Sequence, residues 1–247
     1  MRRAAVMTML LWSSAAFAAE RNPTGAPADW PTPMMGDQPY GAVFLDRLEY
    51  GDSDEDETIL WDAQAWYGGD YNKVWLETEG EGPTGETPEA ELQLLFDRAF
   101  SPFWSWRAGV RYDARPHGED DTAYAALGIQ GLAPQWFETD VALFVSEDGD
   151  VSLNGEAEYE VLITQRLILQ PRLEVAVSGS DVPELGLGSG VTSTEAGLRL
   201  RYEIRRELAP YAGVRWERLY GDTRELARGE GEPTSVTSFV VGIRAWF

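Results

Sequence analysis

The sequence ends in Phe239-Val240-Val241-Gly242-Ile243-Arg244-Ala245-Trp246-Phe247, and the alternation in this stretch indicates the fold. In a β-strand, one face of the stretch would be wholly apolar, with Phe239, Val241, Ile243, Ala245 and Phe247. The other face would be mixed, with Val240, Gly242, Arg244 and Trp246. A strand of a membrane barrel has this form because one face meets lipid and the other faces the lumen. The stretch therefore predicts the closing strand of a transmembrane β-barrel.

The start of the sequence has the features of a secretory signal peptide over residues 1–18. Arg2 and Arg3 give a positive beginning, an apolar stretch follows, and Ala16-Phe17-Ala18 is an A-x-A cleavage site. No later stretch approaches the run of about 18 apolar residues that a transmembrane helix needs. We therefore expect an exported protein of the cell outer membrane. Its aromatic end also resembles the signal that the barrel-assembly machinery reads, which makes that machinery an expected partner.

Composition and charge exclude several classes of protein. The formal net charge is −22, and it becomes about −24 once Arg2 and Arg3 leave with the signal peptide. Nucleic acid is not an expected partner, because phosphate binding needs a basic surface. The chain has no cysteine, so it has neither a disulfide framework nor a thiolate metal site. A mean hydropathy of −0.33 suits a barrel, in which only alternate residues meet lipid.

The chain divides into a proline-rich part and a part made of strands. Residues 19–40 are rich in proline and predict a flexible periplasmic segment. Residues 41–247 predict an all-β, antiparallel barrel of about twelve strands, closed by the C-terminal aromatic strand. The expected strands are 42–50, 58–67, 71–79, 89–99, 103–114, 123–131, 136–146, 151–163, 167–178, 192–205, 209–218 and 237–247. Ten or fourteen strands are the alternatives.

The connections between these strands support a membrane barrel. Those after the even-numbered strands are tight, whereas most of those after the odd-numbered strands are longer and acidic. Outer-membrane barrels have this asymmetry, with short periplasmic turns and long extracellular loops. The loop 221–236 is an example of the long kind. An even number of strands also puts both ends of the barrel in the periplasm.

Alternation predicts which charged residues face the lumen. In the eighth strand, Val151, Leu153 and Val161 belong to the lipid face, and the glutamates lie between them. A charge at the middle of the lipid face costs roughly 2–4 kcal/mol, so the charged face must point inward. The residues that we expect to line the lumen are Glu138, Asp140, Glu156, Glu158, Glu160, Arg172, Glu174, Arg199 and Arg201. The same alternation turns inward Arg107, Arg111, Asp113, Gln170, Glu195, Glu203, Arg215 and Glu217.

Tight turns suggest which of these charges are neighbours. A hairpin centred on Gly149 would put Glu158 beside Asp140 and Glu160 beside Glu138. Adjacent carboxylates repel each other, so they need an arginine or a bound cation between them.

A hairpin centred on Gln165 would put such an arginine, Arg172, opposite Glu158. Two interpretations follow: an internal salt-bridge lattice that fills a narrow lumen, or a pathway for cations.

Several long segments resemble the copper resistance protein B family. They include WDAQAWYGGDYNKVWL at 61–76, YAALGIQGLAP at 124–134 and TQRLILQPR at 164–172. Further matching segments are 46–50, 89–93, 109–113, 144–150 and 201–207. The resemblance covers about residues 40–247. It implies an outer-membrane protein that helps to sequester or export periplasmic copper, with copper transported or loosely bound and a periplasmic copper carrier as a candidate partner.

The sequence departs from that family in its copper ligands. Family members usually carry a segment rich in methionine and histidine before the barrel, and this chain has only Met34 and Met35 there. Its one histidine is His117, in an expected extracellular loop. Cu(I) prefers thioether or thiolate ligands and Cu(II) imidazole, so this chain cannot build a strong copper store alone. Met34, Met35 and His117 are weak metal candidates, and an inert linker and a solvated loop are the alternatives.

Two other functions compete with copper homeostasis. A narrow porin without a metal role would show steady conductance governed by the charged lumen. A hydrolase would need a nucleophile next to a base, and His117 has no G-x-S-x-G motif near it, so we expect no enzyme. The other expected partners are membrane lipid and lipopolysaccharide, and the expected state is a monomer.

Overall fold

The structure is a computed structural model and describes residues 38–54, 56–115 and 121–247. The predicted signal peptide and most of the predicted proline-rich segment lie outside these residues. So do the metal candidates Met34, Met35 and His117. No helix among the described residues is long and apolar enough to cross a membrane.

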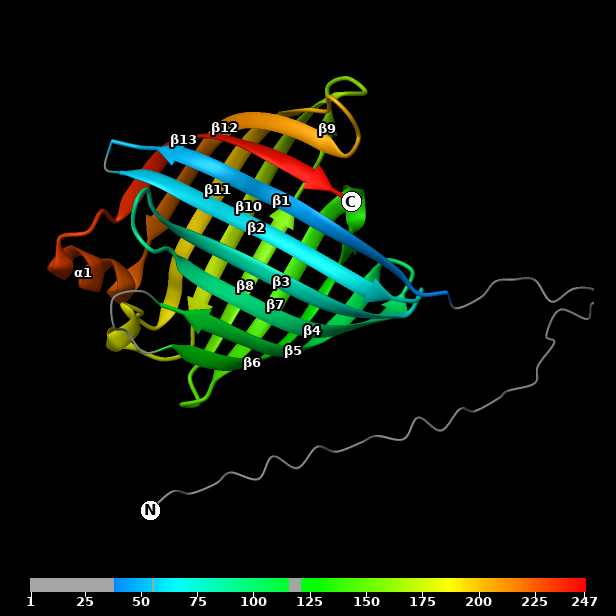
Figure 1. Cartoon of the computed structure of the whole chain (residues 1–247). Helices are drawn as coiled ribbons and strands as arrows, with labels where there is room; N and C mark the ends of the chain where they lie inside the picture. The colour runs from blue at the N-terminus through cyan, green and yellow to red at the C-terminus, as the bar shows by residue number, and fades with distance from the viewer. Residues whose placement is uncertain (1–37, 55, 116–120) are drawn as a thin grey trace, which may run out of the picture. The chain divides into compact units, whose positions relative to one another are not determined.

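The described chain is almost entirely antiparallel sheet (Figure 1). Its strands are β1 (Tyr40–Asp52), β2 (Glu57–Gly68), β3 (Asn72–Pro83), β4 (Glu89–Ser101), β5 (Trp104–Ala114), β6 (Thr122–Ala133), β7 (Phe137–Ser146), β8 (Val151–Glu158), β9 (Val161–Leu162), β10 (Leu167–Ser178), β11 (Gly190–Tyr202), β12 (Leu208–Leu219) and β13 (Ser235–Trp246). Single 3-10 turns occur at Pro134–Trp136 and Pro183–Leu185, and the helix α1 spans Gly221–Glu230.

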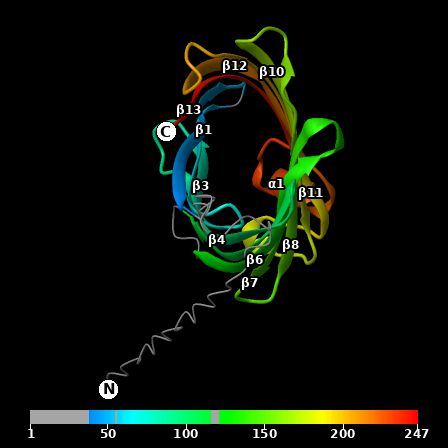
Figure 2. The ribbon, with the colours of Figure 1, turned by 90° about the vertical axis from the view of Figure 1, so that its right-hand side faces the viewer.

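The strands form a closed ring, as the view along the barrel shows (Figure 2). Each strand pairs with its neighbours in the sequence, β13 pairs with β1, and β10 pairs with β11. β8 and β9 both pair with β10 and occupy one position in the ring. The fold is therefore a closed barrel of twelve strand positions, and the C-terminal strand closes it. This confirms the predicted fold class.

β8 and β9 correspond to the single strand predicted over 151–163. Both strands pair with β10 in one continuous register: Glu158 lies opposite Arg172, and Leu162 lies opposite Ile168. Between them, the amide of Tyr159 donates to the carbonyl of Pro171 at 3.1 Å. Proline has no N–H to return a hydrogen bond, so the ladder is interrupted at this point. The predicted pairing of Arg172 with Glu158 is confirmed.

The predicted register between β7 and β8 is wrong by two residues. Glu138 lies opposite Glu158, and Asp140 lies opposite Glu156. The turn is centred on residue 148 rather than on Gly149, because Gly149 takes a φ of 94°. Glycine adopts this left-handed conformation at little cost, and it lets the turn close one residue earlier.

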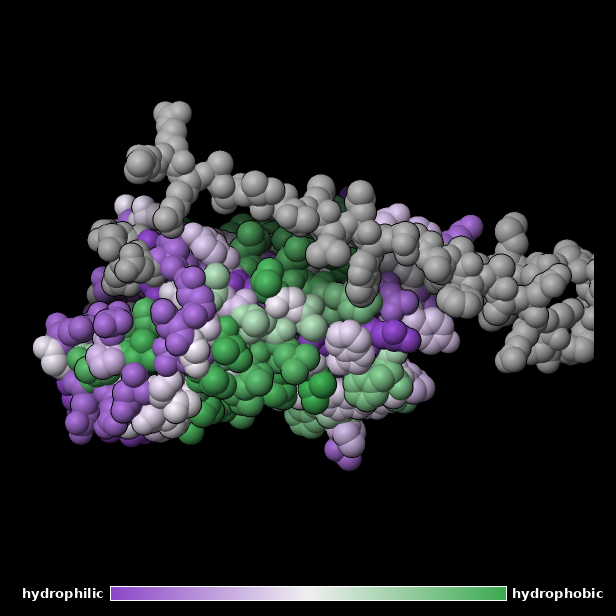
Figure 3. All heavy atoms as spheres, turned by 90° about the horizontal axis from the view of Figure 1, so that it is seen from below, coloured by the Kyte–Doolittle hydropathy of each residue, from purple (hydrophilic) through white to green (hydrophobic). Residues whose placement is uncertain are grey.

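The outer surface carries an apolar band with polar residues at both ends (Figure 3). On β4 to β6 this band is built from exposed aliphatic and aromatic side chains: Leu92, Leu94, Phe96, Val110, Tyr112, Leu127 and Ile129. The inner surface is the reverse, because its buried residues include many charges, among them Arg47, Glu49, Arg107, Arg172, Arg199, Arg201 and Arg215. Only a lipid environment suits an apolar band of this kind.

One apolar cluster lies inside the barrel. Leu95, Ala126 and Phe144 are buried together on the wall formed by β4, β6 and β7, and Trp75 packs against them from β3. Guanidinium groups cover this aromatic surface, with Arg111 centred 4.7 Å from the Phe144 ring and Arg107 5.4 Å from the Trp75 ring. Cation–π contacts of this kind hold the arginines against one wall of the lumen.

The loop expected over 221–236 contains the helix α1. The helix begins with Asp222 in its first turn, has Arg228 in its last turn, and ends at Gly231 with a φ of 87°. These are ordinary signals for the start and end of a helix. Thr223 fixes α1 beside the β10–β11 loop by accepting a hydrogen bond from the amide of Gly188 at 2.9 Å. α1 lies at the mouth opposite the tight turns (Figure 1).

Candidate functional site

The lumen holds a cavity of about 890 Å³. Its lining includes residues from three tight turns at one end of the barrel: Asp70 between β2 and β3, Pro102 between β4 and β5, and Leu132 where β6 ends. None of the described residues in the loops at the opposite end lines it. The cavity therefore opens toward the end with the tight turns, which the barrel pattern assigns to the periplasm.

The cavity is acidic. Twelve carboxylates line it, against seven cationic side chains. The carboxylates are Asp46, Asp62, Asp70, Glu77, Glu79, Glu91, Asp97, Glu138, Asp140, Glu156, Glu158 and Glu174; the cations are Arg47, Lys73, Arg107, Arg111, Arg172, Arg199 and Arg244. An acidic passage with low-dielectric walls concentrates cations and repels anions.

The strand register places the inward carboxylates in rows. One row crosses five successive positions of the ring: Asp140, Glu156, Glu174, Glu195 and Glu217. A second row crosses β2 to β5: Asp62, Glu79, Glu91 and Asp113. Like charges directly opposite each other on neighbouring strands destabilise a sheet, so each row needs cations close to it.

Arginines from other strands supply these cations. Arg47 donates to Asp62 at 3.0 Å and to Glu79 at 2.6 Å. Arg172 donates to Glu156 at 2.6 Å and to Glu174 at 3.1 Å. Arg47 and Arg172 are themselves buried. Buried guanidinium groups are stable here because several hydrogen-bonded carboxylates surround each of them.

Glu195 joins these groups across the lumen. Its carboxylate lies 3.4 Å from Arg172 on β10, and 4.0 Å from both Arg47 on β1 and Arg215 on β12. Arg215 in turn bonds Glu81 on β3. We call this connected set the belt: Arg47, Asp62, Glu79, Glu81, Glu156, Arg172, Glu174, Glu195 and Arg215. Glu81, Glu195 and Arg215 do not line the cavity, so the belt lies at the edge of the cavity.

A more deeply buried pair lies next to the belt. Arg199 donates to both carboxylate oxygens of Glu49, at 2.8 and 3.1 Å. The two side chains are only 4% and 2% exposed. Gly213, opposite Arg199 in the register, makes room for it, because a Cβ there would meet the Arg199 Cα at 2.9 Å. The bidentate geometry fixes both side chains between β1 and β11.

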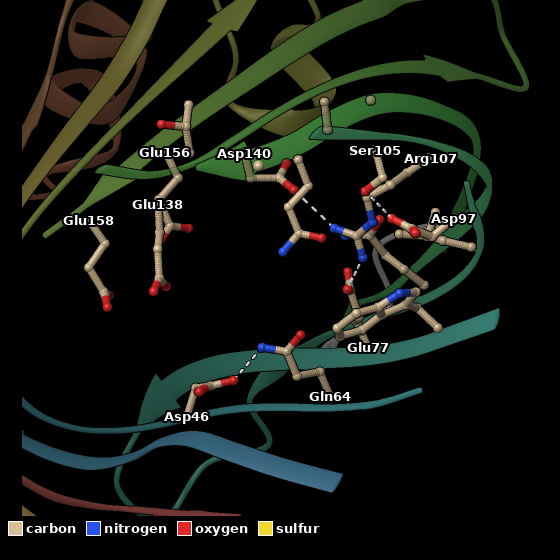
Figure 4. A pocket seen from close by; sticks show the side chains of 18 of the residues that line it. Asp46, Gln64, Glu77, Asp97, Ser105, Arg107, Glu138, Asp140, Glu156 and Glu158 are labelled. Carbon is tan, nitrogen blue, oxygen red and sulfur yellow. Dashed lines mark hydrogen bonds and ion pairs between the residues drawn. The ribbon is translucent and has the colours of Figure 1, made fainter. Parts of the chain in front are cut away.

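Four of the carboxylates that line the cavity form no ion pair with any residue that the structure describes: Asp70 at a tight turn, Asp97, and the neighbours Glu138 and Glu158. Asp97 accepts a hydrogen bond from the Ser105 hydroxyl. Glu138 and Glu158 lie opposite each other on β7 and β8, and neither forms an ion pair with any residue that the structure describes. Glu158 accepts only from the amide of Gln170. Figure 4 shows both carboxylates directed into the open part of the cavity, with Asp46 across from them. We call Glu138 and Glu158 the open pair.

Seven of the nine residues predicted to line the lumen line the cavity. The two others, Glu160 and Arg201, bond each other beside it, and Glu160 also accepts from Arg244 on β13 at 3.3 Å. The belt residues of β1 to β3 were missing from the predicted set: Arg47, Asp62, Glu79 and Glu81. The alternation in β2 and β3 could have shown three of them. Asp46 and Arg47 lie at a bulge between Leu45 and Leu48, and both neighbours line the cavity.

The anionic ligand atoms of this lumen are carboxylate oxygens. No group of three or more histidine, cysteine, aspartate or glutamate side chains within residues 38–54, 56–115 and 121–247 is placed to hold a metal ion. That part of the chain also contains no methionine, histidine or cysteine. Carboxylates bind copper less strongly than imidazole or sulfur ligands do. The arrangement can attract and exchange cations, but it is not a preformed copper centre.

Comparisons with known proteins identify the family and the fold. The chain is 48% identical to copper resistance protein B of Escherichia coli over 205 residues, which is 83% of this chain and 69% of the relative. It is 42% identical to a copper resistance protein B homolog of Pseudomonas syringae pv. tomato, over 87% of this chain and 72% of the relative.

Among solved structures, the NanC porin matches 82% of this chain and 98% of its own with a TM-score of 0.52 and 10% identity. The KdgM porin matches 84% and 99% with a TM-score of 0.50 and 13% identity. At such low identity these likenesses show the barrel fold alone. The model of the copper resistance protein B precursor matches residues 39–247. The chain therefore belongs to the copper resistance protein B family.

Proposed function

We propose that this barrel protects the cell from copper by taking periplasmic Cu²⁺ into its lumen, where the ion is held loosely or passed outward. The observation that carries the proposal is the acidic cavity, which opens at the end with the tight turns. Family membership supports the copper role. The apolar outer band supports a place in the outer membrane.

The chemistry of the lumen favours Cu²⁺ over Cu⁺. All of the side-chain donors described in the cavity are oxygen or nitrogen groups, and its anionic ligands are carboxylates. Cu⁺ prefers thioether and thiolate ligands, whereas a hydrated divalent ion is attracted by carboxylates. Glu138 and Glu158 are the best placed to receive it, because they lie opposite each other, form no ion pair with a described residue and point into the open part of the cavity. Weak binding is an advantage for passage, since an ion that is held tightly does not leave.

The family and the porin-like fold support a protein without catalytic activity. The charged groups of the lumen hold one another in place, and we infer that their role is electrostatic. A soluble periplasmic copper carrier is the proposed source of the ion, and it would deliver at the mouth that carries the tight turns.

The test is copper tolerance and cell-associated copper in a strain that lacks the gene. Restoring the intact chain should raise tolerance and lower cell-associated copper. A chain with both Met34 and Met35 replaced by leucine tests whether these residues capture the ion. A chain with Glu138 and Glu158 replaced by glutamine tests whether the open pair in the lumen receives the ion.

Two results would contradict the proposal. If deletion changes neither tolerance nor copper content, the copper role fails, and a narrow porin without a metal role explains the barrel better. If deletion matters but the Glu138→Gln, Glu158→Gln chain restores tolerance fully, copper does not depend on the open pair.

A further inference from the structure

The β9–β10 and β11–β12 turns carry a surface that is apolar and has more arginines than carboxylates: Arg166, Arg205 and Arg206 against Glu203 and Glu207. Leu162 and Ile163 at the β9–β10 turn are 63% and 54% exposed, and Ile204 at the β11–β12 turn is 54% exposed. The two turns lie together, because the amide of Glu203 donates to the carbonyl of Arg166 at 2.8 Å. Three exposed arginines accompany these apolar residues: Arg166, Arg205 and Arg206.

A groove of about 470 Å³ begins at this surface. Leu208, Ala245 and Phe247 give it an apolar floor, and Ile204, Arg205 and Glu207 complete its lining. Leu208 and Ala245 are paired neighbours on β12 and β13. Phe247 is held against β1 by two backbone hydrogen bonds with Val43, at 3.0 and 2.9 Å. The groove therefore has a fixed sheet as its floor.

The groove faces outward from the barrel. Phe247 is 79% exposed, and Ile243, which lies on the same face of β13, is 39% exposed. The floor of the groove thus continues the apolar surface that meets lipid. An occupant of the groove must therefore have an apolar part that lies in the membrane. A soluble partner at the mouth of the lumen has no such part.

The charge of the groove rim indicates the other part of the occupant. The chain has a net charge of −22, so a group of cations at one edge is unusual in it. Arg206 pairs with Glu203 at 2.8 Å. Arg166 and Arg205 make no ion pair with any residue in the described ranges. Arginines beside an apolar membrane surface bind anionic lipid headgroups, and the phosphate of a phospholipid suits the guanidinium geometry.

We propose that this groove binds an anionic phospholipid of the inner leaflet of the outer membrane. An acyl chain packs along Leu208, Ala245 and Phe247, and the headgroup phosphate accepts hydrogen bonds from Arg205 and Arg166. The site is independent of copper, because it lies outside the lumen and shares no residue with the belt or the open pair. It would set the depth of this end of the barrel in the membrane.

The test counts lipids bound to the full-length barrel, purified in detergent, by native mass spectrometry with phosphatidylglycerol or phosphatidylcholine added. The intact chain should bind phosphatidylglycerol in preference to phosphatidylcholine. Each cation near an anionic lipid surface changes affinity by about fivefold. The Arg166→Gln, Arg205→Gln double variant removes two such cations and should therefore bind phosphatidylglycerol about 25-fold more weakly.

The matched control is Arg218→Gln, Arg228→Gln, which removes two exposed cations from the opposite end of the barrel. It should leave phosphatidylglycerol binding unchanged. Heat-modifiable migration on a gel confirms that each variant is a folded barrel. A further variant, Ile204→Gln, removes an apolar lining residue at an exposed turn and should also weaken binding.

Three results overturn the proposal. Equal binding of the two lipids by the intact chain shows that no anionic headgroup is recognised. Equal loss in the double variant and its control shows a general effect of charge. Unchanged phosphatidylglycerol binding in the Arg166→Gln, Arg205→Gln variant shows that these arginines do not bind the lipid headgroup. An acidic soluble partner would then explain them better.

Discussion

The belt and the open pair are two carboxylate regions of the same lumen, and they differ in their arginine partners. Glu195 of the belt faces Arg47, Arg172 and Arg215, at 3.4 to 4.0 Å. Glu138 and Glu158 of the open pair face each other and form no ion pair with any residue that the structure describes. The belt carboxylates therefore cross-link the barrel wall, whereas the open pair is available to a mobile cation. One acidic lumen thus contains both a closed structural part and an accessible part.

The difference follows from the strands that carry the arginines. Those of the belt come from β1, β10 and β12, and their side chains reach carboxylates on several other strands. Near the open pair, Arg107 is already bound to Glu77 and to Asp140, the latter at 2.9 Å. Arg201 is likewise bound to Glu160. The seven cations of the cavity do not suffice for twelve carboxylates, and Glu138 and Glu158 are among the four that form no ion pair with a described residue.

The largest expected effect concerns the buried pair beside the belt. Replacing Glu49 by glutamine leaves the Arg199 guanidinium almost fully buried without a counter-ion. Breaking a buried pair in this way costs about 3–5 kcal/mol. We therefore expect the free energy of unfolding of the barrel to fall by about this amount, measured by urea titration in lipid vesicles with tryptophan fluorescence as the signal.

The matched control is Glu203→Gln, which removes the partner of Arg206. The Arg206 side chain is 69% exposed, and an exposed pair contributes at most about 1 kcal/mol. A fall of equal size in the two variants would show that burial does not distinguish these pairs. It would also remove the stabilising role assigned to the groups beside the belt.

The next effect concerns closure of the lumen by the belt. Replacing Glu195 by glutamine removes the carboxylate that joins three arginines, and Arg47 and Arg172 repel each other. We expect these side chains to separate and the single-channel conductance in a planar bilayer to rise severalfold. Glu217→Gln is the control, because it removes the next carboxylate of the same row, which forms no ion pair among the described residues. Conductance that stays at the level of the intact chain in Glu195→Gln would mean that another element closes the barrel.

Much of this arrangement could be predicted from the sequence, because side chains alternate strictly in a strand. The period of two in β8 places Glu156 and Glu158 inward, and the tight β9–β10 turn places Arg172 opposite Glu158. The alternation fails at irregular positions. The bulge in β1 hides the inward direction of Arg47, and the conformation of Gly149 moves the β7–β8 register by two residues.

The partners of the arginines could not be predicted in this way. Arg172 lies opposite Glu158 in the register, yet its guanidinium binds Glu156 and Glu174. The long side chain of Arg172 extends along the strand, so its guanidinium reaches the carboxylates of these two residues. Arg215 binds Glu81, which is 134 residues away in the sequence. Such a contact depends on closure of the ring, and no local pattern contains it.

The smallest expected effect concerns the open pair itself. Replacing both Glu138 and Glu158 by glutamine lowers the excess of carboxylates over cations in the cavity from five to three. The preference for cations should therefore decrease without being lost, since selectivity follows the summed charge of the lumen. The measurement is the reversal potential in a potassium chloride gradient, made in the Glu195→Gln background if closure limits the current.

Replacing Glu147 and Asp148 by their amides removes the same charge from an exposed turn and provides the control. Charges on an exposed turn outside the lumen are screened by salt. This control should therefore shift the reversal potential less than the lumen variant does. If the two double variants shift it equally, cation selectivity arises from the net charge of the whole protein. The open pair would then be two solvated glutamates, and the contrast with the belt would concern stability alone. A larger shift in the lumen variant would place the cation beside Glu138 and Glu158, which form no ion pair with a described residue.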